Sequence, residues 1–287
     1  MIRTEKNSNP EDFYKVGDVI ERIPWLNDPL YAKGVHSLWE EFSDEAQRLV
    51  LQVLLERFTH HYHQDIYRSV DDLIDFVYKE GGNHKNSVII GTATGMDSDG
   101  AMHGLYYFKN PLAKKNIGWG ERNIVPVFSF ACEKCKSEKV KNIFVFDDFI
   151  GSGNTLVKRI NELKEFLELR ASPFNIFVIS FAGMEFGIQN LISSTGVEVY
   201  CPLILKKGIS EYDSSDRDSM KETVLGMEKK LGSKWKKLKI DAFSLGYKQS
   251  ETLYAVYRGN CSNNVFPIFW WPRNNSGGKR VTLFDRL

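Results

Sequence analysis

The chain has 287 residues, with 38 Lys and Arg against 37 Asp and Glu, so its formal net charge is +1. Hydrophobic residues at 42% and aromatic residues at 13% suffice for a sizeable core, which excludes global disorder. The balanced charge provides no general attraction to nucleic acid or anionic membranes, and no stretch approaches the roughly 18 consecutive apolar residues of a membrane span. With four Cys and a polar, charged start, the composition predicts a soluble, reduced, cytoplasmic protein without a disulfide framework.

The N-terminal third is expected to be irregular at first and then helical. Residues 1–30 contain three prolines, which favours an irregular leader. From about residue 38 to residue 78 the apolar residues recur at helical spacing. One helix is expected to start at Ser43-Asp44-Glu45, with Leu49, Val53, Leu54 and Phe58 close to one face. A second is expected over Val70–Lys79, ended by the following glycines.

The pattern then changes to short, continuous apolar runs, which are typical of strands buried on both faces, as in a parallel sheet. These runs cover residues 88–90, 125–130, 143–146, 176–181 and 197–200. A helix expected over 155–170 lies between the third and fourth runs, which favours a right-handed strand–helix–strand unit. We therefore predict an α/β fold with a central, mainly parallel sheet, followed by an ordered, aromatic loop region over 260–287.

The most informative segment is IFVFDDFIGSGNTL, residues 143–156, in which a buried strand leads into the adjacent carboxylates Asp147 and Asp148. The small-residue loop Gly151-Ser152-Gly153-Asn154-Thr155 then opens a helix. Small residues let backbone N–H groups converge on an anion, two hydroxyls add donors, and the helix start adds the positive end of its dipole. A glycine could be expected at position 154. Asn154 can take its place, because Asn is the non-glycine residue that best tolerates positive φ. The loop is therefore predicted to bind a phosphate group.

The two carboxylates would repel that phosphate, so they must serve another part of the ligand. Carboxylates only accept hydrogen bonds, and the vicinal hydroxyls of a ribose are suitable donors. A ribose 5-phosphate unit satisfies both ends. Other glycine-loop motifs fit less well, because a Walker A loop needs Gly-Lys-Ser/Thr and a Rossmann fingerprint needs its acid about 20 residues after the loop. The alternative is a plain β–α turn with exposed acids.

The segment resembles, over all fourteen residues, the phosphoribosyl-pyrophosphate (PRPP) signature of type I phosphoribosyltransferases. The resemblance implies that Asp147 and Asp148 contact the ribose hydroxyls, as catalytic and metal-binding residues, and that residues 151–155 hold the 5-phosphate. It also implies a central sheet of the type I phosphoribosyltransferase kind. The implied reaction displaces pyrophosphate from C1 of PRPP with Mg²⁺ through an oxocarbenium-like state, which electrostatic preorganisation would stabilise.

A second loop, GTATGMDSDGAMHG over residues 91–104, stands where that family holds pyrophosphate. Thr94, Gly95 and Ser98 are the expected substrate-binding residues, although Asp97 and Asp99 would repel pyrophosphate unless Mg²⁺ lies between. Lys109, Lys114, Lys115 and Arg122 follow in the region of the family's mobile catalytic loop. Lys109 is the candidate for substrate binding, and the alternative for each is a solvated surface charge.

The flanks narrow the resemblance. The helical segment before the first strand, the signature and the tail NNVFPIFWWPRNNSGGKRVTLFDRL are together similar to the PRTase-CE type of phosphoribosyltransferase-like domain from bacterial conflict systems. The implied organisation is a helical N-terminal extension over 1–85, a phosphoribosyltransferase-like core over 86–205, and a C-terminal hood or partner-binding region over 206–287.

The same resemblance implies a function and partners. The function is that of an effector of an anti-phage system, for example a retron, acting on PRPP or a nucleotide. The implied partners are a reverse transcriptase–nucleic-acid complex and a winged-helix protein, and a homo-oligomer is left open. The alternative function is a non-catalytic module on the same fold that senses PRPP or a nucleotide, or binds a partner.

Four further patterns leave alternatives open. Cys132 and Cys135 have the spacing of half a zinc site, or are reduced thiols beside a strand end. The segment 59–65 contains three His residues but lacks the zincin spacing, which favours a partly exposed polar segment. The lysines between residues 229 and 239 enclose Trp235 and could contact nucleic acid, or form a solvated face. The tail aromatics Phe266, Phe269, Trp270, Trp271 and Phe284 belong either to the core or to a hood over an acceptor base, with Asn263, Asn264 and Arg286 as hydrogen-bonding groups.

Overall fold

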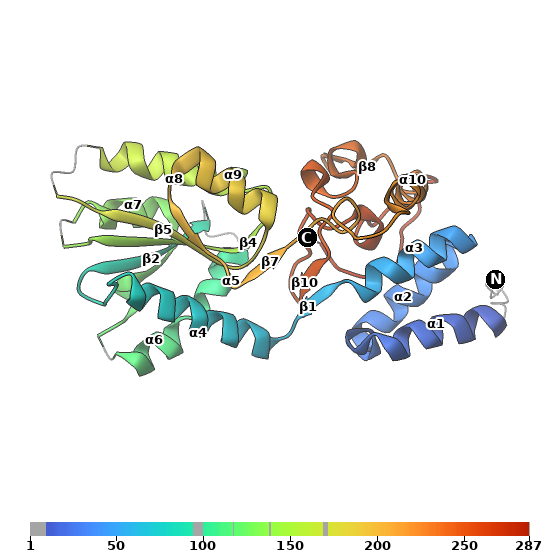
Figure 1. Cartoon of the computed structure of the whole chain (residues 1–287), viewed down its shortest axis with the longest axis horizontal. Coiled ribbons are helices and arrows are strands. Elements are labelled where there is room, and N and C mark those ends of the chain that lie inside the picture. The colour runs from blue at the N-terminus through green and yellow to red at the C-terminus, as the bar shows by residue number, and fades with distance from the viewer. Residues whose placement is uncertain (1–9, 94–99, 117, 138, 169–171, 287) are drawn as a thin grey trace. The chain divides into compact units, whose positions relative to one another are not determined.

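The computed structural model describes residues 10–93, 100–116, 118–137, 139–168 and 172–286. Its contacts group the chain into two compact units, one formed by Met1–His60 with Lys207–Leu287 and the other by His61–Lys206 (Figure 1). The sequence predicts domain boundaries near residues 85 and 205. The grouping instead assigns residues 61–85 to the unit that contains the sheet, and unites the N-terminal helices with the C-terminal region.

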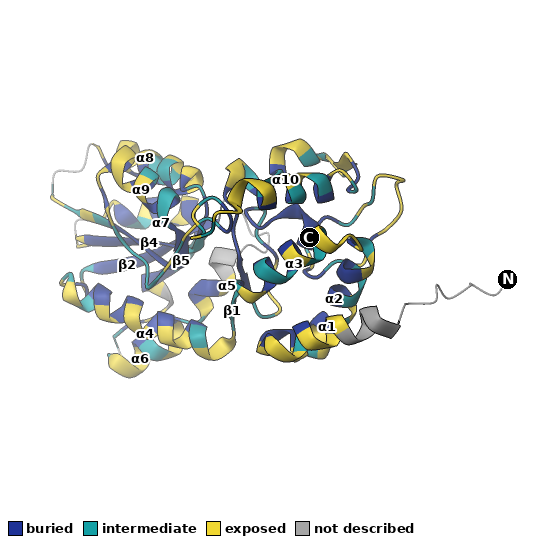
Figure 2. Cartoon of the chain, turned by 45° about the vertical axis from the view of Figure 1, so that its right-hand side comes forward, coloured by how far each residue is buried: buried dark blue, intermediate teal, exposed yellow. Residues whose placement is uncertain are grey.

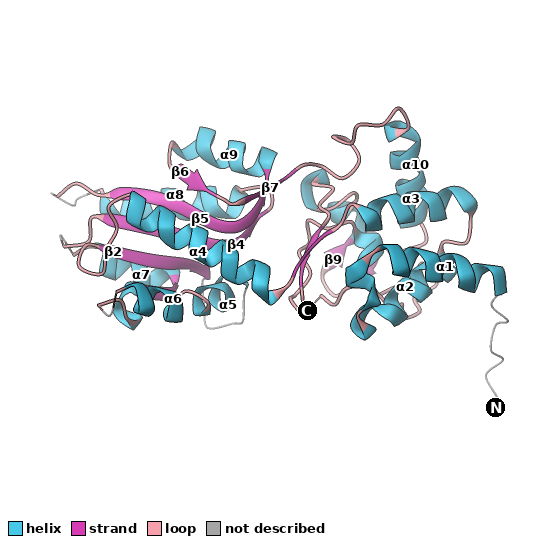
Figure 3. Ribbon diagram, turned by 60° about the horizontal axis from the view of Figure 1, so that its bottom comes forward, coloured by secondary structure: helices cyan, strands magenta, loops and turns pink. Residues whose placement is uncertain are grey.

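The unit His61–Lys206 is built on a parallel sheet. Its strands are β2 (Ser87–Ala93), β3 (Ile124–Val127), β4 (Asn142–Ile150), β5 (Asn175–Met184), β6 (Glu198–Tyr200) and β7 (Leu203–Leu205). The neighbours run in the order β3-β2-β4-β5-β6, with β7 also paired to β5, and every pairing is parallel (Figure 3). The five predicted apolar runs provide the first five strands, which confirms the expected α/β class with a mainly parallel sheet.

Helices cover both faces of this sheet. The helices α4 (His63–Lys79), α5 (Gly100–Tyr106) and α6 (Lys109–Lys115) lie on one side, and α7 (Phe128–Cys135), α8 (Asn154–Leu167) and α9 (Glu185–Thr195) lie on the other (Figures 1 and 3). Alternate residues of β4 separate accordingly, because successive strand residues point to opposite faces. Phe144 and Phe146 contact the rings of Phe76 and Phe108, whereas Ile143 and Val145 share a core with α7, α8 and α9.

The strand order changes direction between β2 and β4. From β2 the chain goes to β3 on one side, through the turn η2 (Glu121–Asn123), and then to β4 on the other side. In open parallel sheets, ligands bind outside the carboxyl ends of the strands at such a switch point. The two segments expected to bind a ligand lie at or after the carboxyl ends of β2 and β4 in the sequence. The topology therefore favours a ligand-binding site at the edge of the sheet where the segment 143–156 lies.

The other unit combines the two ends of the chain around an aromatic core. Its helices are α1 (Pro10–Arg22), α2 (Pro29–Glu41), α3 (Glu45–Glu56) and α10 (Arg217–Glu228). Short strands pair β1 (Thr59–His61) with β10 (Tyr254–Val256) and β8 (Lys234–Trp235) with β9 (Leu238–Lys239). The 3-10 turns are η1 (Pro24–Asn27), η3 (Ile240–Phe243), η4 (Tyr247–Gln249) and η5 (Pro267–Phe269).

The C-terminal tail is largely irregular, and its residues 264–271 are buried, whereas residues 275–279 are exposed (Figure 2 colours the chain by burial). Phe266, Phe269, Trp270 and Trp271 are at most 1% exposed and pack in one cluster with residues of α2 and α3. Phe284 lies in the same cluster. These aromatic residues are therefore core, and the alternative of an exposed wall over an acceptor base is not what the structure shows.

The N-terminal prolines begin helices rather than preventing them. The expectation of an irregular leader is wrong over residues 10–22, where α1 begins at Pro10. Pro24 and Pro29 begin η1 and α2. Proline is tolerated at the first position of a helix because the N–H group it lacks would have no partner within the helix.

Three other helix boundaries or faces differ from expectation. Asp44 caps α3 as predicted, since its carboxylate accepts from the N–H groups of Ala46 and Gln47. The buried face of α3 is shifted, however, because Leu49 is 61% exposed, while the buried residues of the helix are Val50, Leu51, Leu54 and Leu55. Helix α4 begins at His63, seven residues before the expected start, and the run 125–130 is a strand only to Val127. Among the helices of the described residues, none has the length and apolar character needed to cross a membrane.

Candidate functional site

The two predicted acids lie in the second half of β4. Asp147 and Asp148 are both half-buried, and β4 continues past them to Ile150 in register with β5. The hydroxyl of Thr92 on β2 donates to Asp147 Oδ1 at 3.3 Å. Because consecutive residues of a strand point to opposite faces, Asp148 faces away from the side on which Thr92 meets Asp147. The two carboxylates are therefore not equivalent, since each has different neighbours.

Arg159 of α8 links the helix after the loop to the strand beside it. Its Nε donates to the carbonyl of Thr92 at 3.3 Å, its Nη1 pairs with Glu162 at 2.6 Å, and its guanidinium lies 5.2 Å from the centre of the Phe128 ring. The side chain is only 15% exposed. Arg159 thus fixes the end of β2 next to Asp147. Arg159 is not among the residues predicted from the sequence, although its position within two turns of the loop is a signal that could have identified it.

The loop after β4 leads into α8 through a left-handed glycine. Gly153 has φ 77° and ψ −11° and is the N-cap of α8, while Asn154 is the first helical residue. The expected positive φ therefore falls on Gly153 and not on Asn154. A glycine N-cap has no side chain that could accept from the first N–H groups of the helix, so these donors lack a side-chain cap and lie at the positive end of the helix dipole. Thr155 in this first turn is exposed, as a phosphate-binding hydroxyl would need to be.

The loop rests against the first turns of α9. A Cβ atom added to Gly187 would lie 1.9 Å from the carbonyl oxygen of Gly151, and one added to Gly153 would lie 2.4 Å from the carbonyl oxygen of Gly187. Asn190 Nδ2 also donates to the carbonyl of Ser152 at 2.9 Å. The sequence analysis missed Gly187 and Asn190. A glycine in the first turn of the helix after β5 was the available signal.

The remaining predicted site residues lie elsewhere or outside the described residues. Thr94, Gly95 and Ser98 belong to the segment 94–99, which the structure does not describe. Lys109 begins α6 and is exposed, with its Nζ 5.6 Å from the centre of the Tyr106 ring. The region from Lys109 to Arg122, expected to contain a catalytic loop, is helical over Lys109–Lys115, and the expected pyrophosphate loop 91–104 becomes helical at Gly100. Lys115 pairs with Asp75 of α4, so it serves the packing of α6 on α4.

The alternative metal sites are not assembled within the described residues, which contain no group of three or more His, Cys, Asp or Glu side chains able to hold a metal. Cys132 and Cys135 are buried in α7, and burial raises the pKa of the Cys132 thiol, which disfavours the thiolate that zinc requires. His60 stacks on Trp25 at 5.2 Å and shares a hydrogen bond of 2.7 Å with the Tyr31 hydroxyl. His60 thus takes part in aromatic packing.

The basic run and the tail polar groups also have structural partners. Trp235 lies in the β8–β9 hairpin with its ring 6.1 Å from that of Trp271, so the indole holds the hairpin against the core. Lys230 Nζ donates to the Glu41 carbonyl at 3.0 Å. Arg286 donates to the carbonyl of Cys261, and its burial lowers the pKa of the guanidinium. Base recognition by Trp235 or Arg286 would require these contacts to break.

The parallel sheet, the carboxylates on β4 and the glycine-capped helix at the switch point define an α/β protein with a candidate site for a phosphate-bearing ligand. A family model described as PRTase-CE matches residues 35–286. The chain therefore belongs to the PRTase-CE family and is phosphoribosyltransferase-like, and the match extends across both units.

Two solved structures similar to this chain are phosphoribosyltransferases. The xanthine-guanine-hypoxanthine phosphoribosyltransferase of Helicobacter pylori is 14% identical, with 52% of this chain and 86% of that chain covered and a TM-score of 0.31. The orotate phosphoribosyltransferase of Aeropyrum pernix is 18% identical, with 47% and 68% covered and a TM-score of 0.29. Such scores carry no argument about function. A search of curated proteins finds no significant match.

Proposed function

We propose that this protein is a phosphoribosyltransferase-like enzyme that acts on C1 of a 5-phosphoribosyl group, in PRPP or in a nucleotide. The observation that carries the proposal is the arrangement at the end of β4, where two carboxylates and a glycine-capped helix start lie at the switch point of a parallel sheet. Family membership supports the same reaction class. An anion at the helix start and hydroxyls at the carboxylates are the groups that this arrangement would bind.

Each residue has a defined task in this proposal. The N–H groups of the loop and the hydroxyls of Ser152 and Thr155 bind the 5-phosphate. Asp147 and Asp148 accept hydrogen bonds from the ribose hydroxyls, and their negative charges stabilise the positive charge that develops at C1 as the leaving group departs. Thr92 holds Asp147 in place through its hydrogen bond. We also assign Thr94, Gly95, Ser98 and Lys109 to the pyrophosphate side of the ligand.

The carboxylates of Asp147 and Asp148 fit a Mg²⁺ ion that is bound together with a phosphate-bearing substrate. Mg²⁺ is usually held by one or two carboxylates, completed by substrate phosphates and water, rather than by an all-protein cage. Asp147 and Asp148 are half-buried carboxylates at the strand end and meet this requirement. When bound, the ion would neutralise charge on a departing pyrophosphate.

The test is a calorimetric titration with PRPP and Mg²⁺, combined with an assay of pyrophosphate release or nucleotide loss. Wild-type protein should bind, Asp148→Asn should weaken binding at least tenfold, and the Asp147→Asn/Asp148→Asn double variant should lose turnover. Asp71→Asn, at an exposed position of α4, is the matched control and should behave as wild type. Turnover that survives in the double variant would reject the assigned roles.

A second candidate is a non-catalytic sensor of PRPP or a nucleotide. The groups proposed to bind phosphate and ribose all lie on β4, the loop and α8, and they suffice for binding without turnover. Ligand binding that depends on Asp148, with neither pyrophosphate release nor nucleotide loss, would favour the sensor. Failure of the wild-type protein to bind would reject both candidates.

We extend the proposal to the cell. The wider role is that of a cytoplasmic effector in a bacterial anti-phage system, for example a retron, with a reverse transcriptase–nucleic-acid complex and a winged-helix protein as partners. Membership of the PRTase-CE family supports this role. After phage infection, nucleotide pools should fall in cells with the wild-type gene and stay unchanged in cells with the Asp148→Asn variant. Pools that stay unchanged in both would contradict the role.

A further inference from the structure

The helix α9 contacts the loop through oxygen atoms of the loop backbone. The carbonyl of Gly151 faces Gly187, at a distance that leaves no space for a Cβ atom there. The next carbonyl, that of Ser152, accepts a hydrogen bond of 2.9 Å from Asn190 Nδ2. Two successive carbonyl groups of the loop therefore point toward α9.

This orientation determines where the loop N–H groups point. In a trans peptide unit the C=O and the N–H of the following residue point in opposite directions. The N–H groups of Ser152 and Gly153 consequently point away from α9. Two successive N–H groups that point the same way form the kind of concavity that binds an anion. The N–H groups thus point away from α9 because the carbonyl groups of Gly151 and Ser152 point toward it.

Asn190 is itself held in one orientation. Its Nδ2 also donates to Asn154 Oδ1 at 3.1 Å, and its Oδ1 accepts from the Ser194 hydroxyl at 3.3 Å. The carbonyl of Ser152 can only accept, so the nitrogen of the amide must face the loop. Because both its Nδ2 and its Oδ1 atoms form hydrogen bonds, the Asn190 side chain is fixed in position. The loop needs such a support, because an anion site gains affinity when its donors are ordered before the ligand arrives.

We propose that Asn190 is a positioning residue that presets the loop 151–154 for the 5-phosphate, with Gly187 as the small residue that lets α9 approach. This inference rests on the proposed function and names the element that organises its phosphate end. Asn190 does not touch the ligand. It acts by turning the carbonyl of Ser152 toward α9.

The deciding variant is Asn190→Asp, which keeps the shape of the side chain but removes its donors and adds a negative charge. Gln189→Glu is the matched control, because it adds the same charge at the neighbouring, exposed position of α9. Affinity for PRPP with Mg²⁺ is measured by calorimetry at pH 8 and pH 4, relative to wild type at each pH. Unfolding curves verify that every variant is folded under these conditions.

At pH 8, Asn190→Asp should bind at least tenfold more weakly than wild type, and Gln189→Glu should differ by less than threefold. At pH 4 the loss should fall to about twofold, because an Asp side chain of ordinary pKa is then roughly half protonated and the protonated carboxyl group can again donate to the Ser152 carbonyl. A purely structural role would change the unfolding midpoint without this pH-dependent recovery. Asn190→Ala, which removes the donor without adding charge, should be weakened about tenfold at both pH values.

The outcomes separate this inference from the proposed function. If Asp148→Asn loses binding while both Asn190 variants bind as wild type does, the positioning role is overturned and the function stands. If Asn190→Asp and Gln189→Glu lose affinity equally, the effect is one of charge and the inference is overturned. If wild-type protein does not bind PRPP, the proposed function fails and this inference fails with it.

Discussion

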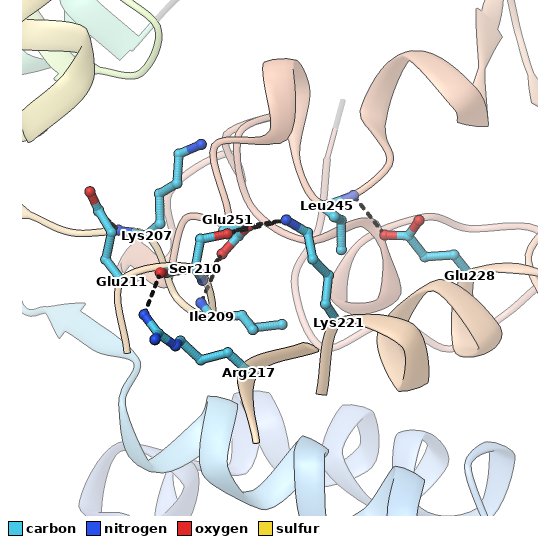
Figure 4. Close-up of polar contacts among 9 residues, drawn as sticks. All are labelled: Lys207, Ile209, Ser210, Glu211, Arg217, Lys221, Glu228, Leu245 and Glu251. Carbon is cyan, nitrogen blue, oxygen red and sulfur yellow. Dashed lines mark hydrogen bonds and ion pairs between the residues drawn. The ribbon is translucent and has the colours of Figure 1, made fainter. Parts of the chain in front are cut away.

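The loop Gly151–Gly153 and the turn Gly208–Ser210 both contain successive backbone N–H groups, and they differ in what accepts from them. In the turn, the carboxylate of Glu251 accepts from the N–H groups of Ile209 at 2.8 Å and Ser210 at 2.6 Å (Figure 4). It also accepts from the Ser210 hydroxyl at 2.5 Å and pairs with Lys221 Nζ at 3.5 Å. Glu251 is 0% exposed. The turn thus contains an internal anion, whereas the loop leads into a helix start without a side-chain cap.

The comparison shows how one type of backbone feature serves two purposes. A carboxylate supplied by the chain converts converging N–H groups into a structural anchor, and strained backbone around Glu251 agrees with that role. Leu245, Gln249 and Glu251 all have φ near +50°, which non-glycine residues adopt at a cost. In the loop, where no carboxylate among the described residues takes this place, we propose that the same kind of donor set binds an anion from solution.

Removing the internal anion should have the largest effect. Glu251→Ala leaves the buried N–H of Ile209 and the half-buried N–H of Ser210 without an acceptor, and Lys221 without its anionic partner, so the free energy of unfolding should fall by about 3–5 kcal/mol. Urea unfolding measures this value. The control is Glu211→Ala in the same turn, where an exposed carboxylate accepts from the Lys207 N–H at 2.5 Å.

Water can replace the exposed carboxylate of Glu211, so the control should lose at most about 1 kcal/mol. Equal losses in the two variants would contradict the view that Glu251 is a buried anchor. Affinity for PRPP should remain at the wild-type value in any folded fraction of either variant.

A substitution in the loop 151–153 should reduce the affinity for PRPP more than it reduces the free energy of unfolding. Gly153→Ala places a Cβ atom 2.4 Å from the Gly187 carbonyl at φ +77°, so we expect a loss of roughly 2–3 kcal/mol in stability and a large loss of PRPP affinity. The matched control is Gly196→Ala, at φ +67° with no atom within 4 Å of the added Cβ.

The control carries the backbone strain without the clash and should lose about 1 kcal/mol with unchanged affinity. Calorimetry and urea unfolding of both variants separate the two contributions. The proposed geometry of the loop would be wrong if Gly153→Ala bound PRPP as tightly as Gly196→Ala does.

The sequence predicts the strand and the loop of the candidate site because their signal is local. Fourteen consecutive residues contain the apolar run, the acids and the small residues, and the structure places them on β4, the turn and α8. The supports of the loop could not be predicted in the same way. Asn190 is 38 residues from Ser152, and its contact depends on how α9 follows β5, which no short pattern encodes.

The tail shows the same limit in the other unit. Its aromatic residues were recognised, but whether they were core or an exposed wall depended on what covers them. The covering residues include Leu38 and Leu54, more than 200 positions away in the chain. The positive φ at Gly153 rather than Asn154 is an error of one residue, and it arose because a glycine N-cap and an asparagine in the first turn produce the same small-residue pattern.

The smallest expected effect concerns Glu228, the second buried carboxylate of Figure 4. It accepts from the Ser244 hydroxyl at 2.6 Å and the Leu245 N–H at 2.9 Å, but burial outweighs these bonds and raises its pKa. A raised pKa in the folded state means that this group stabilises the fold less as pH rises through that pKa, and most below its unfolded value. From pH 4 to pH 7, wild-type protein should therefore lose about 1 kcal/mol or less relative to Glu228→Gln.

The glutamine variant can satisfy the same two partners without charge, since its oxygen accepts from the Leu245 N–H while its NH₂ group donates to the Ser244 oxygen. Glu222→Gln, at an exposed position of α10, controls for the loss of one negative charge. Urea unfolding at both pH values gives the comparison. If Glu228→Gln lost as much stability at pH 7 as Glu251→Ala does, Glu228 would be a second structural anchor. A buried carboxylate with two neutral donors would then stabilise the fold as well as one that also pairs with a cation.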